Sequence, residues 1–575
     1  MKTLQISNKA SNGFFGEAAV QSYARRIMRC SRLPTARMSP STDSVLNTLM
    51  GCPAAPMTPW RPAFGDGSVA RRLARRVAGL TPTLVLALSL GGCSWWMPFG
   101  PTPKPTNVAT LFPIEHYDQN VDRWIDPNAP GYDRPLLTEP NQRAQYDALF
   151  ARYWGTGAQD PSPWNVSFVN AAVYRTGGED IAALQRRRVT RFDNRMQDSK
   201  HRGYGQNLRE HDTTWIDGIS ANMDIAQFSR NAGYAAVRRA IAVDNAPVRS
   251  LPTADPFFYD SKIAGEGYPF DNLQISAVRP GTPLYVLGTT VDGAWRYVQT
   301  TEVQGWVPSR DLGFVDEAFV TRWRTAARQS FGAVVGASVP VRDASGVFRF
   351  AAPAGTLLPI AARDGSGTEV LIPVADADQH AQIRTARVAA GEQAIVPMPW
   401  AMTPRHVAQL VKALIGRPYG WGNEGFYNDC SSELQSIYAA FGIWLPRHSS
   451  NQMTAGNHVD LTSRSPAERI AWVTQHGTPL RTIIYIGGHV MLYLGNTKRG
   501  EQVVPVVYQD IWGLRPAQNT RRAIIGGSVI MPLTLEIPED TDLRSLVAGP
   551  VFEATTIDGP IPPGFNPESG DDPAS

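Results

Sequence analysis

The sequence predicts an α+β protein of three or four modules, in which a helical N-terminal part and two small β domains precede a domain with helices and an antiparallel sheet. Three observations support this prediction. The chain has 575 residues, 43% hydrophobic and 18% charged, a globular composition that is too long for one domain. Residues 251–399 contain short alternating runs separated by turn residues. From Thr403 the hydrophobic spacing becomes that of helices.

The formal charge of +4 is unevenly distributed along the chain. Residues 1–92 hold twelve Lys or Arg and three Asp or Glu, a net charge of +9, so the rest of the chain carries −5. A nucleic-acid-binding protein would show a basic balance in its folded part. We therefore expect no nucleic acid partner.

Residues 1–92 are expected to be a leader that contains an export signal. Four arginines within residues 71–76 precede an apolar run that ends in LGGC at residues 90–93. The run is shorter than the roughly 20 residues of a spanning helix. The alternative is a chance apolar stretch with a stray cysteine. Because a signal normally starts close to the first residue, we interpret residues 1–56 as a start assigned too early, with Met57 as a candidate for the true start.

The LGGC ending resembles the lipobox of bacterial lipoproteins, whose cysteine is acylated and becomes the mature N-terminus. By this resemblance Cys93 carries a lipid that anchors the protein in the cell envelope on the periplasmic face. Ser94 would suit delivery to the outer membrane of a cell that has two membranes. Without residues 1–56, Cys93 and Cys430 are the only cysteines. An exported chain with one unpaired thiol and no disulfide framework favours a reactive role for that thiol.

The next segments are predicted to be a tether and a helical domain. Residues 93–112 combine the anchor with a Pro-rich linker, which favours an extended chain. Residues 113–250 are predicted to form the helical N-terminal domain, with helix-like stretches around 141–153 and 224–243.

Two small β domains are predicted over residues 251–317 and 318–399. In the first, strand-like runs flank Asp292 and Gly293, a pair typical of a hairpin turn. This region resembles a bacterial SH3 domain through the hairpin DG-x-W-x-Y-V and the GWV strand that follows. The second region contains a weaker set of strands and resembles another SH3-like β barrel. The barrels either stabilise the chain or bind a polymer, and the sequence leaves both functions open.

Residues 400–540 contain the predicted catalytic chemistry, centred on Cys430. Apolar residues follow this cysteine at the spacing of one buried helix face: Leu434, Ile437, Tyr438 and Phe441. Cys430 is therefore expected at a helix N-terminus, with Asp429 as the cap and a glycine-rich loop before it. Free amide groups and the helix dipole are expected to favour a thiolate there, as a cysteine nucleophile requires.

A base is expected from the segment IIYIGGHVMLYLG, residues 483–495. Two short strands flank its glycine pair, and His489 begins the second strand, where it can face a helix terminus. Gln509 on the next strand is the candidate for orienting the imidazole, with Asp510 behind it, because a neutral amide can hydrogen-bond to the ring N–H. The alternatives are that Gln509 faces solvent and that His448 serves as the base, although His448 fits a loop better.

The order of four motifs in the C-terminal domain resembles the NlpC/P60 family of cell-wall peptidases. These motifs are Y-G-W-G, N-D-C-S-S at a helix start, L-P-R-x-S-x-x-Q after the helix and G-H-V-x-L-Y-L-G on a strand. The preceding barrels and GEGYPFDNLQ at residues 265–274 are similar to SH3-containing members. The resemblance implies a papain-like fold and hydrolysis of the bond between γ-D-glutamate and a diamino acid in murein peptides.

Matched position by position, Cys430 corresponds to the nucleophile and His489 to the base. Gln509 falls where many members carry a second histidine. By the same resemblance Asp429 and Ser431 hold the substrate's free amine and neighbouring atoms. The cleft-lining residues it implies, which could equally be packing residues, are Tyr419 and Trp421, and Tyr419 could donate to the oxyanion together with the Cys430 amide. Those that would close the far end of the groove are Glu266 and Tyr268.

Two functions of different classes remain open from the sequence. The first is a cysteine endopeptidase of murein peptides. The second is an inactive lipoprotein that binds murein and tethers the envelope to the wall, favoured only by the unusual Gln509. A metal enzyme is a poor third, because the sequence has no HExxH or CxxC motif. We expect no cofactor, a monomer, murein-derived peptides as partners and a mobile acidic tail over residues 541–575.

Overall fold

The computed structural model describes residues 108–389 and 394–559, all within a unit that spans Pro101–Ser575. The predicted leader, the lipidation site Cys93 and most of the linker lie outside the described residues, so the expectations for them stay predictions. In the described part, no helix combines the length and apolar character needed to cross a membrane.

The N-terminal helices agree only in part with the helices predicted from the sequence. Helix α3 (Glu139–Trp154) covers the stretch expected at 141–153 and is capped by Thr138, whose side chain accepts from the Asn141 amide. The helix predicted at 224–243 is wrong. Only α7 (Gln227–Arg230) is α-helical there, because Gly233 turns the chain with φ +111° and a strand follows. The other α-helices of this part are α2 (Val121–Trp124), α4 (Val166–Phe168), α5 (Glu179–Arg191) and α6 (Thr213–Met223).

The first sheet has seven strands and begins before the predicted boundary at residue 251. In spatial order its strands are β4 (Gln274–Val278), β3 (Ala246–Arg249), β7 (Gln304–Pro308), β6 (Trp295–Gln299), β5 (Pro283–Thr289), β2 (Arg239–Ala242) and β8 (Leu312–Phe314). The short strands β2 and β3 are almost fully buried and lack alternation, so the sequence pattern did not reveal them. The predicted Asp292-Gly293 turn joins β5 to β6.

The second sheet also has seven strands and follows α8 (Glu317–Gln329). In spatial order they are β11 (Phe348–Pro353), β10 (Ser338–Asp343), β14 (Ala381–Ala389), β13 (Gly367–Ala375), β12 (Leu357–Asp364), β9 (Phe331–Val334) and β15 (Ile395–Pro397). Neither sheet closes into the expected barrel, because no ladder joins the two end strands. In the first sheet, the end strand β4 packs instead against residues 421–426 of the C-terminal domain.

The C-terminal domain is built on a third seven-stranded sheet. Its spatial order is β1 (Ala109–Leu111), β20 (Arg522–Pro532), β19 (Gln502–Leu514), β18 (Val490–Arg499), β17 (Thr482–Tyr485), β21 (Glu553–Thr556) and β16 (Asn457–Asp460). All neighbouring pairs are antiparallel except β1 with β20. Helices cover both faces: α10 (Cys430–Ala439) packs on one and α11 (Pro466–His476) on the other.

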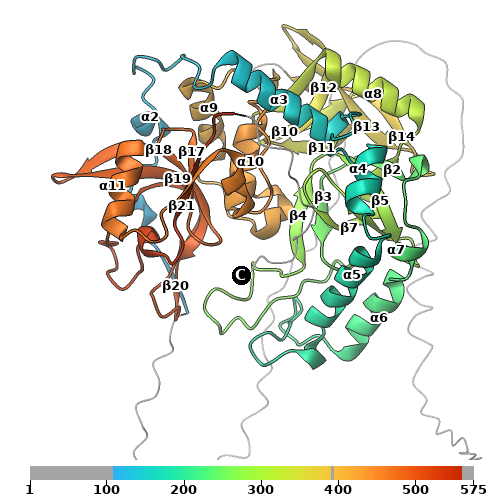
Figure 1. The fold of residues 1–575 in the computed structure, drawn as a ribbon, viewed down its shortest axis with the longest axis horizontal. Coiled ribbons are helices and arrows are strands. Elements are labelled where there is room, and N and C mark those ends of the chain that lie inside the picture. Colours follow the sequence, from blue (N-terminus) through green and yellow to red (C-terminus); the bar gives the residue numbers. More distant parts are fainter. Residues whose placement is uncertain (1–107, 390–393, 560–575) are drawn as a thin grey trace, which may run out of the picture. The chain divides into compact units, whose positions relative to one another are not determined.

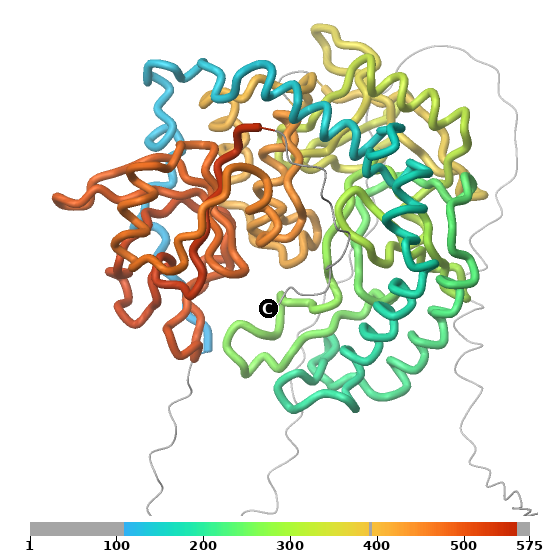
Figure 2. Tube along the Cα trace, in the orientation of Figure 1, coloured from blue at the N-terminus to red at the C-terminus, as the bar shows by residue number. Residues whose placement is uncertain are grey.

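The predicted tail at 541–575 is wrong for its first half. Strand β21 inserts between β17 and β16, and Phe552, Ala554 and Ile557 are buried. The acidic Pro- and Gly-rich residues that suggested a tail lie mostly beyond residue 559, outside the described part. Figure 2 shows the last described residues ending beside α3, where Asn141 donates to the Asp558 carboxylate at 3.4 Å.

Helix α10 lies between the C-terminal sheet and the two SH3-type regions (Figure 1). Arg279, just after β4, donates to the Ser436 hydroxyl of α10 at 2.7 Å. Gly355 of the second region packs so closely that a Cβ would lie 3.0 Å from the Ser436 Cα. A third neighbour is α9 (Pro404–Leu414), which the sequence predicted and which is capped by Thr403. The C-terminal sheet, both SH3-type regions and α9 thus hold the helix that carries Cys430.

Candidate active site

Cys430 is the first residue of α10, as the sequence predicted. The Asp429 side chain caps the helix by accepting from the Ser432 amide at 3.0 Å, and the Ser432 hydroxyl accepts from the Asp429 amide at 2.8 Å. This capping box fixes the direction in which the chain enters the helix. The Cys430 side chain is 7% exposed, and Cys430 is the only free cysteine of the described residues.

The predicted thiolate is wrong for this state of the protein. Burial and, to a smaller extent, the neighbouring Asp429 carboxylate raise the pKa of the Cys430 thiol to about 12. The backbone amide of Val490 and the Arg447 guanidinium act in the opposite direction but do not outweigh these effects. The helix N-terminus alone is therefore insufficient to ionise a thiol that is buried beside a negative charge.

His489 directly precedes β18, Gln509 lies in the middle of β19, and their side chains meet. The His489 Nε2 lies 2.7 Å from the Gln509 Oε1, so the amide oxygen accepts the ring N–H and leaves Nδ1 as the basic nitrogen. Burial lowers the pKa of His489 to about 4. The Val490 backbone amide forms a hydrogen bond with the Cys430 thiol, so the residue that directly follows His489 lies at the sulfur. The pair is neutral at pH 7.

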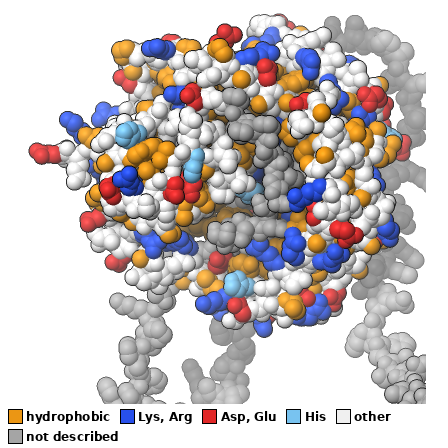
Figure 3. All heavy atoms as spheres, viewed as in Figure 1, with side chains coloured by type: hydrophobic (Ala, Val, Ile, Leu, Met, Phe, Trp, Pro, Cys, Tyr) orange, Lys and Arg blue, Asp and Glu red, His pale blue; other side chains and the backbone are white. Residues whose placement is uncertain are grey.

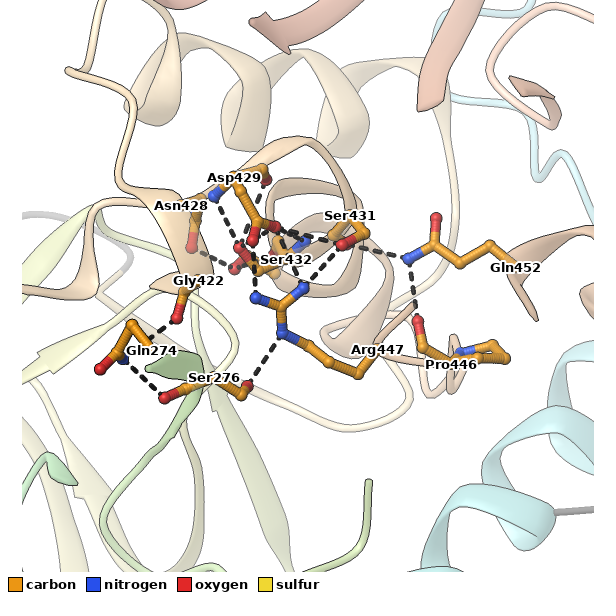
Figure 4. A network of polar contacts seen from close by, with 11 residues as sticks. Gln274, Ser276, Gly422, Asn428, Asp429, Ser431, Ser432, Pro446, Arg447 and Gln452 are labelled. Carbon is orange, nitrogen blue, oxygen red and sulfur yellow. Dashed lines mark hydrogen bonds and ion pairs between the residues drawn. The ribbon is translucent and has the colours of Figure 1, made fainter. Parts of the chain in front are cut away.

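Asp429 and Ser431 belong to a buried network around Arg447 (Figure 4). The Arg447 Nη2 donates to the Asp429 Oδ2 at 2.6 Å, and its Nη1 donates to the Asp429 Oδ1 at 3.2 Å and to the Ser431 hydroxyl at 2.8 Å. Burial would raise the pKa of Asp429, but the Arg447 charge and the bonds from Ser432 hold it below its ordinary value. Asp429 is thus a permanent buried anion beside Cys430.

An aromatic cluster lies beside these residues. The ring centroids of Trp421 and Phe270 are 5.1 Å apart, those of Phe270 and Trp512 are 5.5 Å apart, and those of Trp512 and Tyr419 are 6.2 Å apart. Burial raises the pKa of Tyr419 well above its ordinary value, and the nearby Cys430 adds to this rise. The Tyr419 hydroxyl therefore stays protonated and can donate a hydrogen bond near the thiol.

The two remaining predicted residues, Glu266 and Tyr268, take different positions. Burial raises the pKa of the Glu266 carboxyl, whereas the nearby Arg522 charge opposes the rise. Tyr268 is 81% exposed, and the centroid of its ring lies 6.2 Å from that of Phe258. Neither side chain forms a hydrogen bond with His489 or Gln509. Phe270, two residues further along, is the member of this loop that joins the aromatic cluster.

Two buried carboxyl groups lie behind Cys430. Glu433 of α10 accepts from the hydroxyls of Tyr508 and Ser528 and from the Asn428 amide. Asp510 is 1% exposed, and both of its carboxyl oxygens lack a hydrogen-bonding partner among the described residues. Burial beside Glu433 and Asp429 raises the pKa of Asp510 well above its ordinary value. In the described ranges, no three His, Cys, Asp or Glu residues are grouped to hold a metal ion.

Sequence reasoning missed four members of the site: Arg447, Ser276, Phe270 and Trp512. The L-P-R motif did offer a signal for Arg447, which follows two apolar residues. An arginine in such a segment is seldom buried without a carboxylate partner, so the motif could have indicated an ion pair. Nothing in the sequence linked Ser276 to Cys430, since more than 150 residues separate them. On the face drawn in Figure 3, basic and acidic side chains are interspersed.

Comparison with known families gives three matches along the chain. Residues 256–308 match the SH3 domain of SH3b1 type, residues 316–364 match the SH3 domain of SH3b2 type, and residues 416–512 match the NlpC/P60 family. The order of these matches is the order that the motifs predicted.

Two curated relatives and one solved structure are similar to this chain. The gamma-D-glutamyl-L-lysine dipeptidyl-peptidase of Bacillus subtilis (strain 168) is 29% identical over 105 residues, 18% of this chain and 36% of its own length. The protein of the same name from Bacillus cereus is 31% identical over 98 residues, 16% of this chain and 29% of its own. The chain thus matches about a third of the length of these relatives. An NlpC/P60 endopeptidase from Photobacterium damselae subsp. piscicida is 26% identical, with a TM-score of 0.65, over 79% of this chain and 100% of that structure.

Proposed function

Because the chain carries an NlpC/P60 domain behind two SH3b domains, we propose that it is a cysteine peptidase that hydrolyses the γ-D-glutamyl bond to a diamino acid in murein peptides. The observation that carries this proposal is the His489–Gln509 hydrogen bond beside the buried Cys430. A nucleophile, a base and a group that orients the base are the parts that acyl transfer by cysteine requires. The names of the two Bacillus relatives support the substrate class.

The neutral resting pair implies that proton transfer and attack occur together. The Cys430 thiol gives its proton to the His489 Nδ1 as the sulfur attacks the γ-glutamyl carbonyl carbon, which becomes a tetrahedral oxyanion. Gln509 holds the Nε2–H and thereby stabilises the imidazolium that forms. His489 then protonates the leaving amine, and water hydrolyses the thioester with His489 as its base.

Two hydrogen-bond donors are available for the oxyanion. They are the Cys430 backbone amide at the helix N-terminus and the protonated Tyr419 hydroxyl. The Asp429 carboxylate, with Ser431 beside it, is the proposed ligand of the substrate's free amine. Trp421, together with Phe270 and Trp512, would line the peptide-binding cleft, while Glu266 and Tyr268 would limit its length.

The test is mass spectrometry of L-Ala-γ-D-Glu-diaminopimelate incubated with the purified full-length protein, the Cys430→Ala variant and the Cys430→Ser variant. The proposal expects release of the diamino acid by wild type alone, with all three proteins folded. Wild-type protein that binds murein but cuts no murein peptide would instead favour the wall-tethering function.

Export and lipid anchoring through Cys93 are a separate proposal that rests on the sequence alone. The chain would then act as a monomer on the periplasmic face of the envelope. Labelling of cells with an alkyne fatty acid should mark wild type and not a Cys93→Ala variant. A mature protein that carries no acyl group would refute the anchor.

A further inference from the structure

The guanidinium of Arg447 is bound from two sides by different parts of the molecule. From the C-terminal domain, Asp429 and Ser431 occupy Nη1 and Nη2 at 2.6–3.2 Å. From the first SH3b region, the Ser276 hydroxyl accepts from Nε at 2.9 Å. Arg447 and Ser276 are 6% and 1% exposed, so water cannot replace either partner.

The strand that carries Ser276 holds the loop before Cys430 as well (Figure 4). Gln274 of β4 donates through Nε2 to the Gly422 carbonyl at 3.2 Å and to the Ser276 carbonyl at 2.8 Å. At Gly422, which has φ +61°, a Cβ would lie 2.7 Å from the Gln274 carbonyl oxygen. Only glycine allows this approach of the two backbones.

We propose that Arg447 is a positioning residue of the active site, and that Ser276 of the first SH3b region fixes it so that Asp429 and Ser431 face the substrate's free amine. This inference rests on the proposed function. By this inference, strand β4 is part of the peptide-binding machinery. If the SH3b region were only a binding module attached to an independent enzyme, changes in β4 would not affect Asp429.

The geometry explains why an arginine is needed at this position. A guanidinium is planar and offers five N–H donors in fixed directions, so it can hold both Asp429 oxygens, the Ser431 hydroxyl and the Ser276 hydroxyl at once. With Nε fixed by Ser276, the plane of the guanidinium cannot rotate, and the Asp429 carboxylate keeps one orientation. A lysine would supply the charge without this orientation.

The experiment compares Ser276→Ala with Ser309→Ala in the full-length protein. Ser309 is a matched control because it is also buried in the first SH3b region, and its hydroxyl donates to the Gly293 carbonyl. The substrates are L-Ala-γ-D-Glu-diaminopimelate and its N-acetylated form. Ser276→Ala should raise KM for the free-amine peptide by about tenfold, with kcat within about twofold, because it removes binding that ground and transition states share.

Two further readouts separate positioning from a loss of stability. Ser276→Ala should leave KM for the N-acetylated peptide unchanged, because that peptide has no ammonium group for Asp429 to bind. Arg447→Lys should raise KM for the free-amine peptide by about 100-fold while the protein stays folded, since the buried charge remains.

The outcomes distinguish this inference from the proposed function. Wild type that cleaves neither peptide overturns both. Wild type that cleaves, combined with a Ser276→Ala variant that matches Ser309→Ala on both peptides, overturns the positioning role alone. An equal rise of KM on both peptides in Ser276→Ala would also overturn it, because the effect would not depend on the amine.

Discussion

The hydrogen bond from His489 to Gln509 offers the sharpest test of how the base is oriented. Replacing Gln509 with Leu removes the acceptor 2.7 Å from Nε2 and leaves a buried ring N–H without a partner. An unpaired buried donor costs about 1–3 kcal/mol. If this cost appears in the transition state, where the imidazole becomes charged, kcat falls by about 5- to 150-fold.

The pH profile gives this prediction a second readout. In wild type, neutral His489 is the active form, so kcat/KM should fall on the acid side as pH drops through its pKa of about 4. Gln509→Glu places a carboxylate beside the ring and favours the imidazolium, which raises that pKa. The acid limb should therefore move to higher pH in Gln509→Glu and to lower pH in Gln509→Leu, because the Gln509 hydrogen bond raises the pKa of His489.

The matched control for Gln509→Leu is Gln185→Leu. Gln185 is also fully buried, and its Oε1 accepts a ring N–H bond from Trp306 at 3.0 Å, in a cluster without Cys430. The Gln185→Leu variant should lower the stability of the protein and leave kcat unchanged. Steady-state assays that show equal kcat for wild type and folded Gln509→Leu would refute the orienting role.

Two more predictions follow from the buried ionisable groups. Since burial raises the pKa of Cys430 to about 12, iodoacetamide should alkylate it slowly at pH 7. The alkylation rate should rise about tenfold per pH unit. A rate that is constant between pH 6 and 8 would show a thiolate instead. Asp510 has a folded-state pKa above its unfolded value, so its contribution to stability is present below about pH 4 and is lost as pH rises. Urea unfolding should therefore show Asp510→Asn gaining stability relative to wild type as the pH rises from 5 to 7. A pH-independent difference would contradict this.

The elements around the site were predictable where one face of an element is buried. Cys430 with the apolar residues after it predicted α10, and the alternation around His489 predicted β18. The Asp292-Gly293 turn was equally clear from local chemistry. These features depend on the spacing of residues that are close together in the chain, so a single sequence is enough to predict them.

The parts that were not predictable depend on burial and on long-range contacts. Strands β2 and β21 are short and covered on both faces, so they lack alternation. The pKa of Cys430 depends on how deeply the domain buries it, and the helix N-terminus alone suggested the opposite sign. The contact between Ser276 and Arg447 joins two modules that the motifs treat separately.

In the proposed reaction, Cys430 attacks the γ-glutamyl carbonyl and forms a thioester. The most direct measurement is the intact mass of the protein after acid quench within the first turnover of L-Ala-γ-D-Glu-diaminopimelate, followed by peptide mapping. We expect an added L-alanyl-γ-D-glutamyl group on Cys430 of wild type and none on Cys430→Ala. An adduct on another residue, or cleavage by Cys430→Ala at the wild-type rate, would contradict it.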